Sequence, residues 1–206
     1  MKYYIADTHF GHENIIRLCS RPFETAAEMD RHMLAAWQRT VRPEDEVYIV
    51  GDFSFRSRQP TAGILEQLPG RKILLRGNHD RWVKVEPAAV QQLEAAHDLL
   101  MIEDTAPDPG TGVLRSFSVV LCHYPLLEWP QYHRGSLHVY GHVHNSKGHV
   151  YAALRRPFYP EEPGPHPRAL NAGADICGFR PVTLAELMDI NRRWYADGES
   201  AEIVSR

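Results

Sequence analysis

The sequence contains no long apolar run, because nowhere do about 18 apolar residues follow one another, as they would in a membrane-spanning helix. It has only three cysteines, Cys19, Cys122 and Cys177, which lie far apart in or beside short apolar runs. An odd number at this spacing argues against a disulfide framework and indicates buried thiols in a reducing compartment. We therefore expect a soluble, cytoplasmic protein without membrane contact.

Basic residues are not in excess either. The 23 Lys and Arg residues against 26 Asp and Glu residues give a formal net charge of −3, and the isoelectric point is near 6.4. Proteins that hold nucleic acid mainly by neutralising phosphates carry a strong basic excess. The composition therefore predicts no extended nucleic-acid surface, and it leaves the oligomeric state open.

What the chain does contain is a set of five short apolar runs rich in Val, Ile and Tyr. Their length and composition predict buried strands rather than helices. The runs cover residues 3–6, 47–50, 72–75, 118–122 and 137–140.

Helical patterns lie between and after these runs. Residues 25–40 and 183–195 each open with a T-x-x-E capping box and continue with apolar residues at helical spacing. Segments 149–154 and 168–172 are further strand candidates that would extend the sheet. The alternation predicts an α/β protein whose strands are covered by helices, and its 43% of hydrophobic residues suffice for a single domain over residues 1–206.

Residues 155–168 are the one segment of biased composition, since they include five prolines. Proline cannot continue a helix or a central strand, so the segment is predicted to be a mobile, exposed loop. If it lies over a site, Phe158, Tyr159 and Arg168 would contact the substrate.

Polar residues of metal-ligand type follow all five apolar runs. In α/β sheets the loops at the carboxyl ends of strands converge on one crevice. A single DTH or GD is usually a turn, and a lone His beside an apolar run is usually a core residue, but turn chemistry gives no reason for the pattern to recur behind every strand. The residues are Asp7, His9, Asp52, Asn78, His79, Asp80, His123, His142 and His144.

This set suits two divalent cations of hard or borderline character, because it offers oxygen and imidazole ligands and no thiolate. Two cations about 3.5–4 Å apart need a shared anion, so one carboxylate must bridge them. In GHVH, an extended backbone would project His142 and His144 the same way, so that they serve neighbouring metals.

The blocks D-x-H, GD, GNHD, H and GHxH, in this order over residues 7–144, resemble the calcineurin-like metallophosphoesterase superfamily. The stretches DTHFGHENI and LNAGADICGFRPVTLAEL resemble its small single-domain bacterial and phage branch. The resemblance implies a four-layer α/β/β/α sandwich, with central mixed β-sheets flanked by helices. It also implies hydrolysis of a phosphoester by a hydroxide that bridges two metals, without a covalent intermediate.

The resemblance further implies a ligand set for each metal. One metal would be held by Asp7, His9 and His144, and the other by Asn78, His123 and His142, with Asp52 bridging both. The two divalent ions are expected to include manganese (Mn2+), with iron, zinc or nickel as alternatives, because availability matters more than ligand spacing.

Five residues receive further roles from the same resemblance or from their position. His79 would protonate the leaving group, with Asp80 orienting its imidazole, or the two would form a purely structural pair. Arg76 would clamp a phosphate oxygen, as in the protein-phosphatase branch, or form a surface ion pair. His12, like Asn14, would reach the substrate or cap a helix.

Three functions remain open, and the charge of the substrate favours one. A monoester dianion needs more positive charge than Arg76 and Arg134 supply, so we favour phosphodiesterase over phosphomonoesterase. Tyr132, His133 and Tyr159 would stack on a nucleotide-like ring, or lie in a solvated loop. A metal-binding scaffold for protein interaction, without catalysis, is the alternative from another class, but all five blocks are intact. Asn171 and Asp175 are expected behind the ligands or in a turn.

Overall fold

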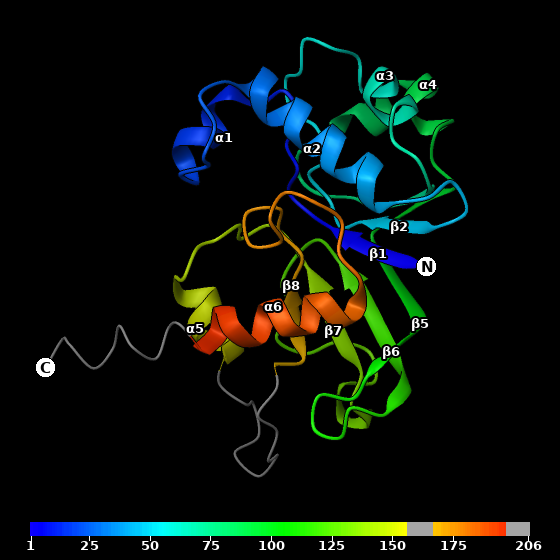
Figure 1. The fold of residues 1–206 in the computed structure, drawn as a ribbon, viewed down its shortest axis with the longest axis vertical. Helices are drawn as coiled ribbons and strands as arrows, with labels where there is room; N and C mark the ends of the chain where they lie inside the picture. Colours follow the sequence, from blue (N-terminus) through cyan, green and yellow to red (C-terminus); the bar gives the residue numbers. More distant parts are fainter. Residues whose placement is uncertain (156–166, 197–206) are drawn as a thin grey trace, which may run out of the picture.

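The computed structural model describes residues 1–155 and 167–196, which form two four-stranded β-sheets (Figure 1). The predicted loop 155–168 therefore lies mostly outside the described residues, and so do Phe158 and Tyr159. Helices α1 to α4 gather around the first sheet, while α5 and α6 lie with the second sheet in the other half of the molecule (Figure 1).

The first sheet has the order β1-β2-β3-β4 and is parallel throughout. Its strands are β1 (Lys2–Ile5), β2 (Glu46–Ile49), β3 (Arg71–Leu75) and β4 (Ala95–His97). The second sheet has the order β5-β6-β7-β8 and is mixed, because β5 runs antiparallel to β6 and the other pairs are parallel. Its strands are β5 (Leu99–Pro107), β6 (Leu114–Cys122), β7 (Leu137–Tyr140) and β8 (Ala169–Asn171).

All five apolar runs are strands, namely β1, β2, β3, β6 and β7, and the candidate 168–172 contains β8. The candidate strand 149–154 was wrong, because it lies in a helix, α5. Tyr151 and Leu154 carry its apolar contacts, and their spacing of three residues suits one face of a helix. The edge strand β5 was not predicted at all.

The helices are α1 (Glu13–Leu18), α2 (Ala26–Thr40), α3 (Thr61–Glu66), α4 (Pro87–Val90), α5 (His149–Arg155) and α6 (Leu184–Ala196). Short 3-10 turns cover Arg81–Lys84 and Tyr132–Arg134. Both predicted capping boxes are confirmed at α2 and α6, since the backbone N–H of Glu28 donates to Thr25 Oγ1 at 3.2 Å and the Thr183 N–H donates to the Glu186 carboxylate at 2.8 Å. Within the described residues, none of these helices combines the length and apolar character that a bilayer crossing requires.

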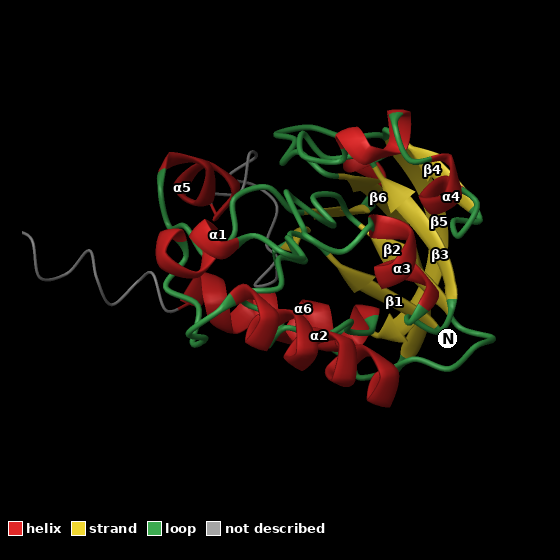
Figure 2. Cartoon of the chain, turned by 90° about the horizontal axis from the view of Figure 1, so that it is seen from above, coloured by secondary structure: helices red, strands yellow, loops and turns green. Residues whose placement is uncertain are grey.

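Three apolar layers hold the sheets and helices together. One lies between the first sheet and α2, α3 and α4, a second lies between the two sheets, and a third covers the outer face of the second sheet. The view from above shows the strands gathered together with helices around them (Figure 2). The fold is therefore the four-layer α/β/β/α sandwich that was predicted.

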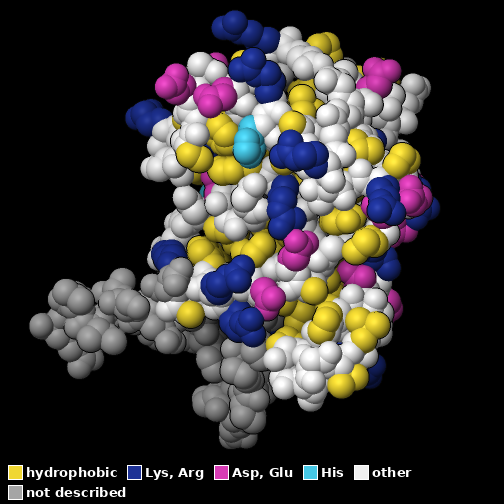
Figure 3. Space-filling model, in the orientation of Figure 1, with side chains coloured by type: hydrophobic (Ala, Val, Ile, Leu, Met, Phe, Trp, Pro, Cys, Tyr) yellow, Lys and Arg dark blue, Asp and Glu magenta, His cyan; other side chains and the backbone are white. Residues whose placement is uncertain are grey.

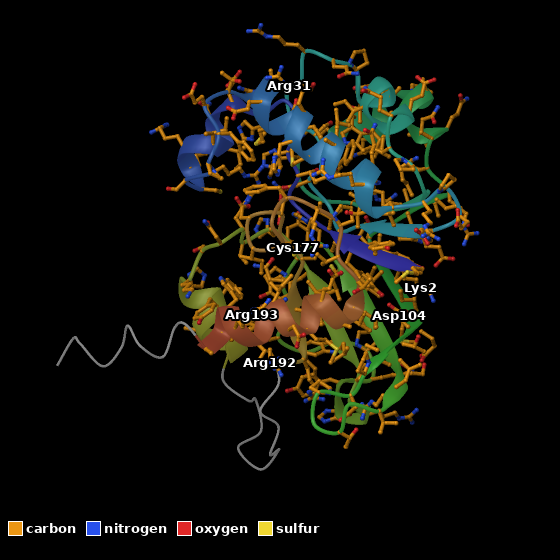
Figure 4. The ribbon with its side chains drawn as sticks, in the orientation of Figure 1. Lys2, Arg31, Asp104, Cys177, Arg192 and Arg193 are labelled. Carbon is orange, nitrogen blue, oxygen red and sulfur yellow. The ribbon has the colours of Figure 1, made fainter. Side chains whose placement is uncertain are left out.

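The three cysteines are free thiols. Cys122 and Cys177 are buried as expected, while Cys19 is only half-buried. Cys177 lies between the two halves of the molecule (Figure 4), and burial raises the pKa of its thiol to about 12. Such a thiol stays protonated and unreactive near neutral pH.

The C-terminal part of the chain covers the free edge of both sheets. Tyr4 of β1 exchanges two backbone hydrogen bonds with Val182, each 2.8–3.0 Å long. The Asn191 side chain of α6 accepts a hydrogen bond from the Asn171 N–H at 2.8 Å and donates one to the Asn171 carbonyl at 3.0 Å. These contacts satisfy backbone groups that an open edge strand would leave exposed.

A buried histidine in β7 holds the loop that follows β6. His138 Nδ1 lies 3.0 Å from the Val120 carbonyl, and Nε2 accepts the Leu126 N–H at 3.1 Å. The carbonyl can only accept, so Nδ1 carries the proton and the ring is neutral. Burial lowers the pKa of His138 to about 4.

The neutral His138 should make the protein sensitive to acid. Below pH 6.5 the unfolded chain binds a proton that the folded chain does not bind until about pH 4, so stability is lost as the pH falls. The loss should be about 2 kcal/mol at pH 5 and about 3 kcal/mol at pH 4. Denaturant unfolding of metal-free protein at pH 7.5, 5 and 4 measures it. His138→Gln cannot titrate, so its stability should fall less steeply; parallel profiles would contradict this account.

Candidate metal centre

Three glycines let the loops behind the strands pack directly on the candidate ligands. A Cβ at Gly51 would lie 2.2 Å from His123 Nδ1, and one at Gly77 would lie 2.2 Å from Asp52 Oδ1. A Cβ at Gly141 would lie 2.8 Å from an Asp7 carboxylate oxygen. No real Cβ approaches so closely, so the GD, GN and GH pairs need glycine for space.

Strained backbone also concentrates at this place. Nine non-glycine residues among those described have positive φ, and five of them are candidate ligands: Asp7, His9, Asp52, His142 and His144. Left-handed residues of this kind usually occur where the structure around them serves a site. The expectation of an extended GHVH segment was therefore wrong, because His142 has φ 72° and His144 has φ 53°.

The first group of ligands comes from the loops after β1 and β7. Asp7, His9 and His144 each offer an atom, and these atoms lie within 4.8 Å of one another. Both ring nitrogens of His9 are buried without a hydrogen-bond partner. Burial also lowers the pKa of His9, so the ring is neutral and keeps a lone pair for a metal.

The second group comes from the loops after β2, β3, β6 and β7. Asp52, His123 and His142 have ligand atoms within 4.8 Å of one another. Asn78 Oδ1 lies 3.3 Å from His123 Nε2 and 3.1 Å from His142 Nδ1. His123 Nδ1 faces the Val50 carbonyl at 2.9 Å, which leaves the Nε2 lone pair free to bind a metal.

Asp52 lies between the two groups. Its Oδ2 atom is 3.6 Å from His9 Nε2 and 3.5 Å from His123 Nε2. Its Oδ1 atom accepts the backbone N–H of His79 at 2.8 Å. One carboxylate oxygen thus faces histidines of both groups, as a shared anion must.

The donor set fits two divalent cations. Asp7 is fully buried and Asp52 is 2% exposed, and burial raises the pKa of Asp7 to about 6. Buried carboxylates of this kind are costly unless a cation or hydrogen bonds compensate them. Together with the unpartnered nitrogens of His9, this is the environment that oxygen- and nitrogen-binding metals satisfy.

His79 and Asp80 do not form the predicted pair. The Asp80 carboxylate accepts four hydrogen bonds of 2.8–3.0 Å, none of them from the His79 imidazole. The donors are the backbone N–H groups of Asp52, Phe53 and Gly77 and the indole of Trp82. Asp80 therefore holds the loops after β2 and β3 together and does not orient a catalytic ring.

His79 and His12 lie at the rim beside Phe55. His79 is one-third exposed, with Nε2 4.0 Å from Asp52 Oδ2. The Phe55 ring packs edge-on against both imidazoles, with centroids 4.5 Å from His79 and 4.6 Å from His12. The His12 side chain makes no capping hydrogen bond to α1 and lies against the ligand His9.

Arg76 has the second of its two predicted roles. Its guanidinium donates two hydrogen bonds of 2.7 Å to the exposed carboxylate of Asp98. Arg56, by contrast, is exposed and left-handed at φ 54°, and it stacks on Phe55 at 5.1 Å. Among the described residues no carboxylate pairs with Arg56, so it is the free cation of this rim.

Tyr132 and His133, two residues expected to stack on the substrate, lie away from the site, and the third, Tyr159, lies outside the described residues. Tyr132 is 7% exposed, packs against Trp129 and lies under the Arg168 guanidinium at 4.0 Å. Arg168 directly precedes β8, so Tyr132 lies at the amino end of this strand, away from the carboxyl ends that carry the ligands. His133 is exposed and lies 3.5 Å from Glu128.

Besides Phe55 and Arg56 at the rim, sequence reasoning missed two further residues that border the site. Tyr124 is 43% exposed, with ring centroids 5.1 Å from His123 and 5.0 Å from His142. Arg21 is buried and bonded to Asp175, which in turn contacts His144. Tyr124 follows the ligand His123 directly, which was an available signal, whereas no sequence pattern marks Arg21.

A family model described as calcineurin-like phosphoesterase matches residues 3–146, which include every candidate ligand. The chain belongs to this family. It is 42% identical over 82 residues to an uncharacterized protein of Methanocaldococcus jannaschii, a match that covers 39% of this chain and 47% of that protein. The chain thus spans less than half the length of this relative.

Two further comparisons cover more of this chain. The gene 66 protein of mycobacteriophage D29 is 28% identical over 161 residues, 69% of this chain and 78% of the phage protein. The crystal structure of an Aquifex aeolicus protein of unknown function superposes with a TM-score of 0.58 at 25% identity, over 88% of this chain and 94% of that one. The predicted superfamily and its small phage branch are therefore confirmed, and the family is one of metal-dependent phosphoester hydrolases.

Replacing Asp80 tests whether it holds the loops or serves His79. The side-chain amide of an Asp80→Asn variant offers one acceptor oxygen where four N–H groups now bond, so buried donors lose their partners. The free energy of unfolding of the metal-free protein should fall by about 2–5 kcal/mol. Asp98→Asn, at an exposed carboxylate, should change it little. Unchanged stability with reduced turnover would instead support a role through His79.

Proposed function

We propose that this phosphoesterase is a dinuclear metal-dependent phosphodiesterase. The observation that carries the proposal is the position of Asp52, whose Oδ2 atom lies 3.5–3.6 Å from histidines of two separate ligand groups. A mononuclear site would not need a buried carboxylate between two sets of imidazoles.

The proposed ligands divide between the two metals as their positions suggest. Asp7, His9 and His144 would hold one cation, and Asn78, His123 and His142 the other, with Asp52 shared. Manganese is our first candidate for both positions, since the ligands are carboxylate, amide and imidazole. When bound, the two cations would supply Lewis acidity, lowering the pKa of water between them and neutralising phosphoryl charge.

The chain's own residues would bind and protonate the substrate. His79 is one-third exposed and faces Asp52, which suits a group that donates a proton to the leaving oxygen. The Phe55 ring packs edge-on against the His79 imidazole, with ring centroids 4.5 Å apart, and so supports its orientation. Arg56, whose guanidinium is unpaired among the described residues, is placed to bind a phosphate oxygen.

The charges and aromatic residues at the rim favour a diester. Asp98 already neutralises Arg76, and among the described residues Arg56 is the cation that stacks on the rim residue Phe55, which is little charge for a monoester dianion. Phe55 and the exposed ring of Tyr124 flank the two ligand groups, and such rings accept the organic substituents of a diester. We therefore propose a nucleotide-like diester as substrate.

A long nucleic acid is a poorer candidate than a small diester. On the face shown in Figure 3, Lys and Arg side chains are interspersed with Asp and Glu. A polyanionic backbone would bind along an extended basic surface, and proteins that bind in this way carry a basic excess, which this chain lacks. The net charge of −3 agrees with this choice.

Two carboxylate variants test the dinuclear centre. Asp52→Asn removes the shared charge and should lower the occupancy of both metals, whereas Asp7→Asn should weaken only one. Elemental analysis of manganese-loaded, desalted protein should find close to two metals per chain in the wild type and about one in Asp7→Asn. Two metals retained in Asp52→Asn would contradict the bridging role.

Kinetics with matched esters test the substrate class. With manganese at mildly alkaline pH, bis(p-nitrophenyl) phosphate should be hydrolysed with a higher kcat/KM than p-nitrophenyl phosphate, because the second ring gains contacts and the single charge needs fewer cations. Asp52→Asn serves as the control for contaminating phosphatases. The reverse order across metals and pH would indicate a phosphomonoesterase. Metal binding without turnover on either ester would favour the scaffold.

A further inference from the structure

A single buried arginine connects the segments that carry one of the two ligand groups. The Arg21 side chain is 0% exposed, and its Nε and one terminal nitrogen donate to both oxygens of Asp175 at 2.9 and 3.0 Å. The same guanidinium donates to the backbone carbonyls of Asp7 at 2.7 Å and Thr8 at 3.0 Å. These carbonyls lie between the left-handed residues Asp7 and His9.

Asp175 extends this connection to the third ligand of the group. Its Oδ2 atom lies 3.0 Å from His144 Nδ1, and its side chain is 1% exposed. The Asp175 carboxylate accepts a hydrogen bond from His144 Nδ1–H, and although burial opposes it, this contact raises the pKa of the metal-free imidazole to about 10. A bound metal would displace the proton on Nε2, while Nδ1 keeps its hydrogen on Asp175. The tautomer of His144 thereby leaves Nε2 as its metal-binding atom.

We propose that the Arg21–Asp175 pair is a positioning device for one metal only, the one assigned to Asp7, His9 and His144. This inference rests on the proposed dinuclear centre. Among the described residues, neither Arg21 nor Asp175 contacts Asn78, His123 or His142, the ligands of the other metal. Breaking the pair should therefore weaken one metal site and spare the other.

A simple stabilising role does not account for this pair. Burying an arginine and a carboxylate costs several kcal/mol per ion, so a buried ion pair is weak support for stability by itself. Here Arg21 donates to two carbonyls of the loop after β1 and to Met29 Sδ of α2, and Asp175 contacts His144. The cost of burial is thus matched by contacts that fix one ligand group.

The pair also excludes a competing metal site. Cys19, His144 and Asp175 have ligand-type atoms within 4.8 Å of one another. Both Asp175 oxygens already accept hydrogen bonds from the Arg21 guanidinium, however, and a second cation there would face its positive charge. The Arg21 cation occupies the place that a third metal would need.

Manganese binding by two variants tests the proposal. Arg21→Met removes the guanidinium and its hydrogen bonds. Asp175→Asn keeps the shape of the side chain but removes its negative charge. In each, one manganese should bind as in the wild type and the other about 10–100-fold more weakly, the usual effect of losing a carboxylate behind a ligand histidine. Calorimetric titration gives both affinities, and electron paramagnetic resonance of the coupled pair should change to that of a single ion. If Arg21→Met does not fold, the manganese affinities of Asp175→Asn alone decide between the outcomes.

Double variants identify which metal is lost. In the Arg21→Met or Asp175→Asn background, adding Asp7→Asn should change manganese binding little, whereas adding His142→Asn should remove the remaining ion. Arg192→Met, at an exposed pair with Asp189 on α6 (Figure 4), is the matched control and should bind two ions normally.

The outcomes separate this inference from the proposed function. A wild-type protein that binds fewer than two manganese ions would overturn the dinuclear centre itself. Two ions in the wild type, with both weakened equally or neither weakened in the variants, would overturn only the positioning role of Arg21 and Asp175. A fall in melting temperature with unchanged metal affinities would show that the pair is merely structural.

Discussion

The buried carboxylate of Asp52 is the group on which the rest of the centre depends. One of its oxygens faces His9 and His123, which come from different sheets, and the other accepts the backbone N–H of His79. An unpaired charge in this position would be costly, so the loops around it must supply either donors or cations. The apolar layer between the sheets brings these loops together, and both ligand groups meet at this carboxylate.

The polar side chains around the centre divide into those that have hydrogen-bond partners and those that have none among the described residues. Asp80 has four donors, and Asp175 is bonded to Arg21 and His144. Both ring nitrogens of His9, in contrast, have no partner. Buried polar groups are normally paired, so an unpaired imidazole among saturated carboxylates marks the place where a cation completes the structure. The same division separates the residues that build the site from those that we propose as metal ligands.

The rim of the site differs most from what the sequence predicted. The arginine expected to bind phosphate, Arg76, is bonded to Asp98, while Arg56 stands free on the Phe55 ring. The tyrosine expected in the wall, Tyr132, is buried under Arg168, while Tyr124 is exposed beside two ligand histidines. In both cases the residue type was right and the position wrong, because pairing partners distant in sequence decide which side chain faces solvent.

By itself, the sequence determined the five strands that precede the ligand blocks, the two long helices and the order of those blocks, because apolar periodicity and capping depend on neighbouring residues. It also determined the family. Only the tertiary structure decided how the candidate ligands are supported. It pairs Arg21 with Asp175, bonds Asp80 to the Asp52 backbone instead of the His79 ring, and gives His142 a left-handed backbone. The burial of a strand can be predicted from its own composition. The partner of a buried charge cannot, because it depends on which distant loops the packed sheets bring together.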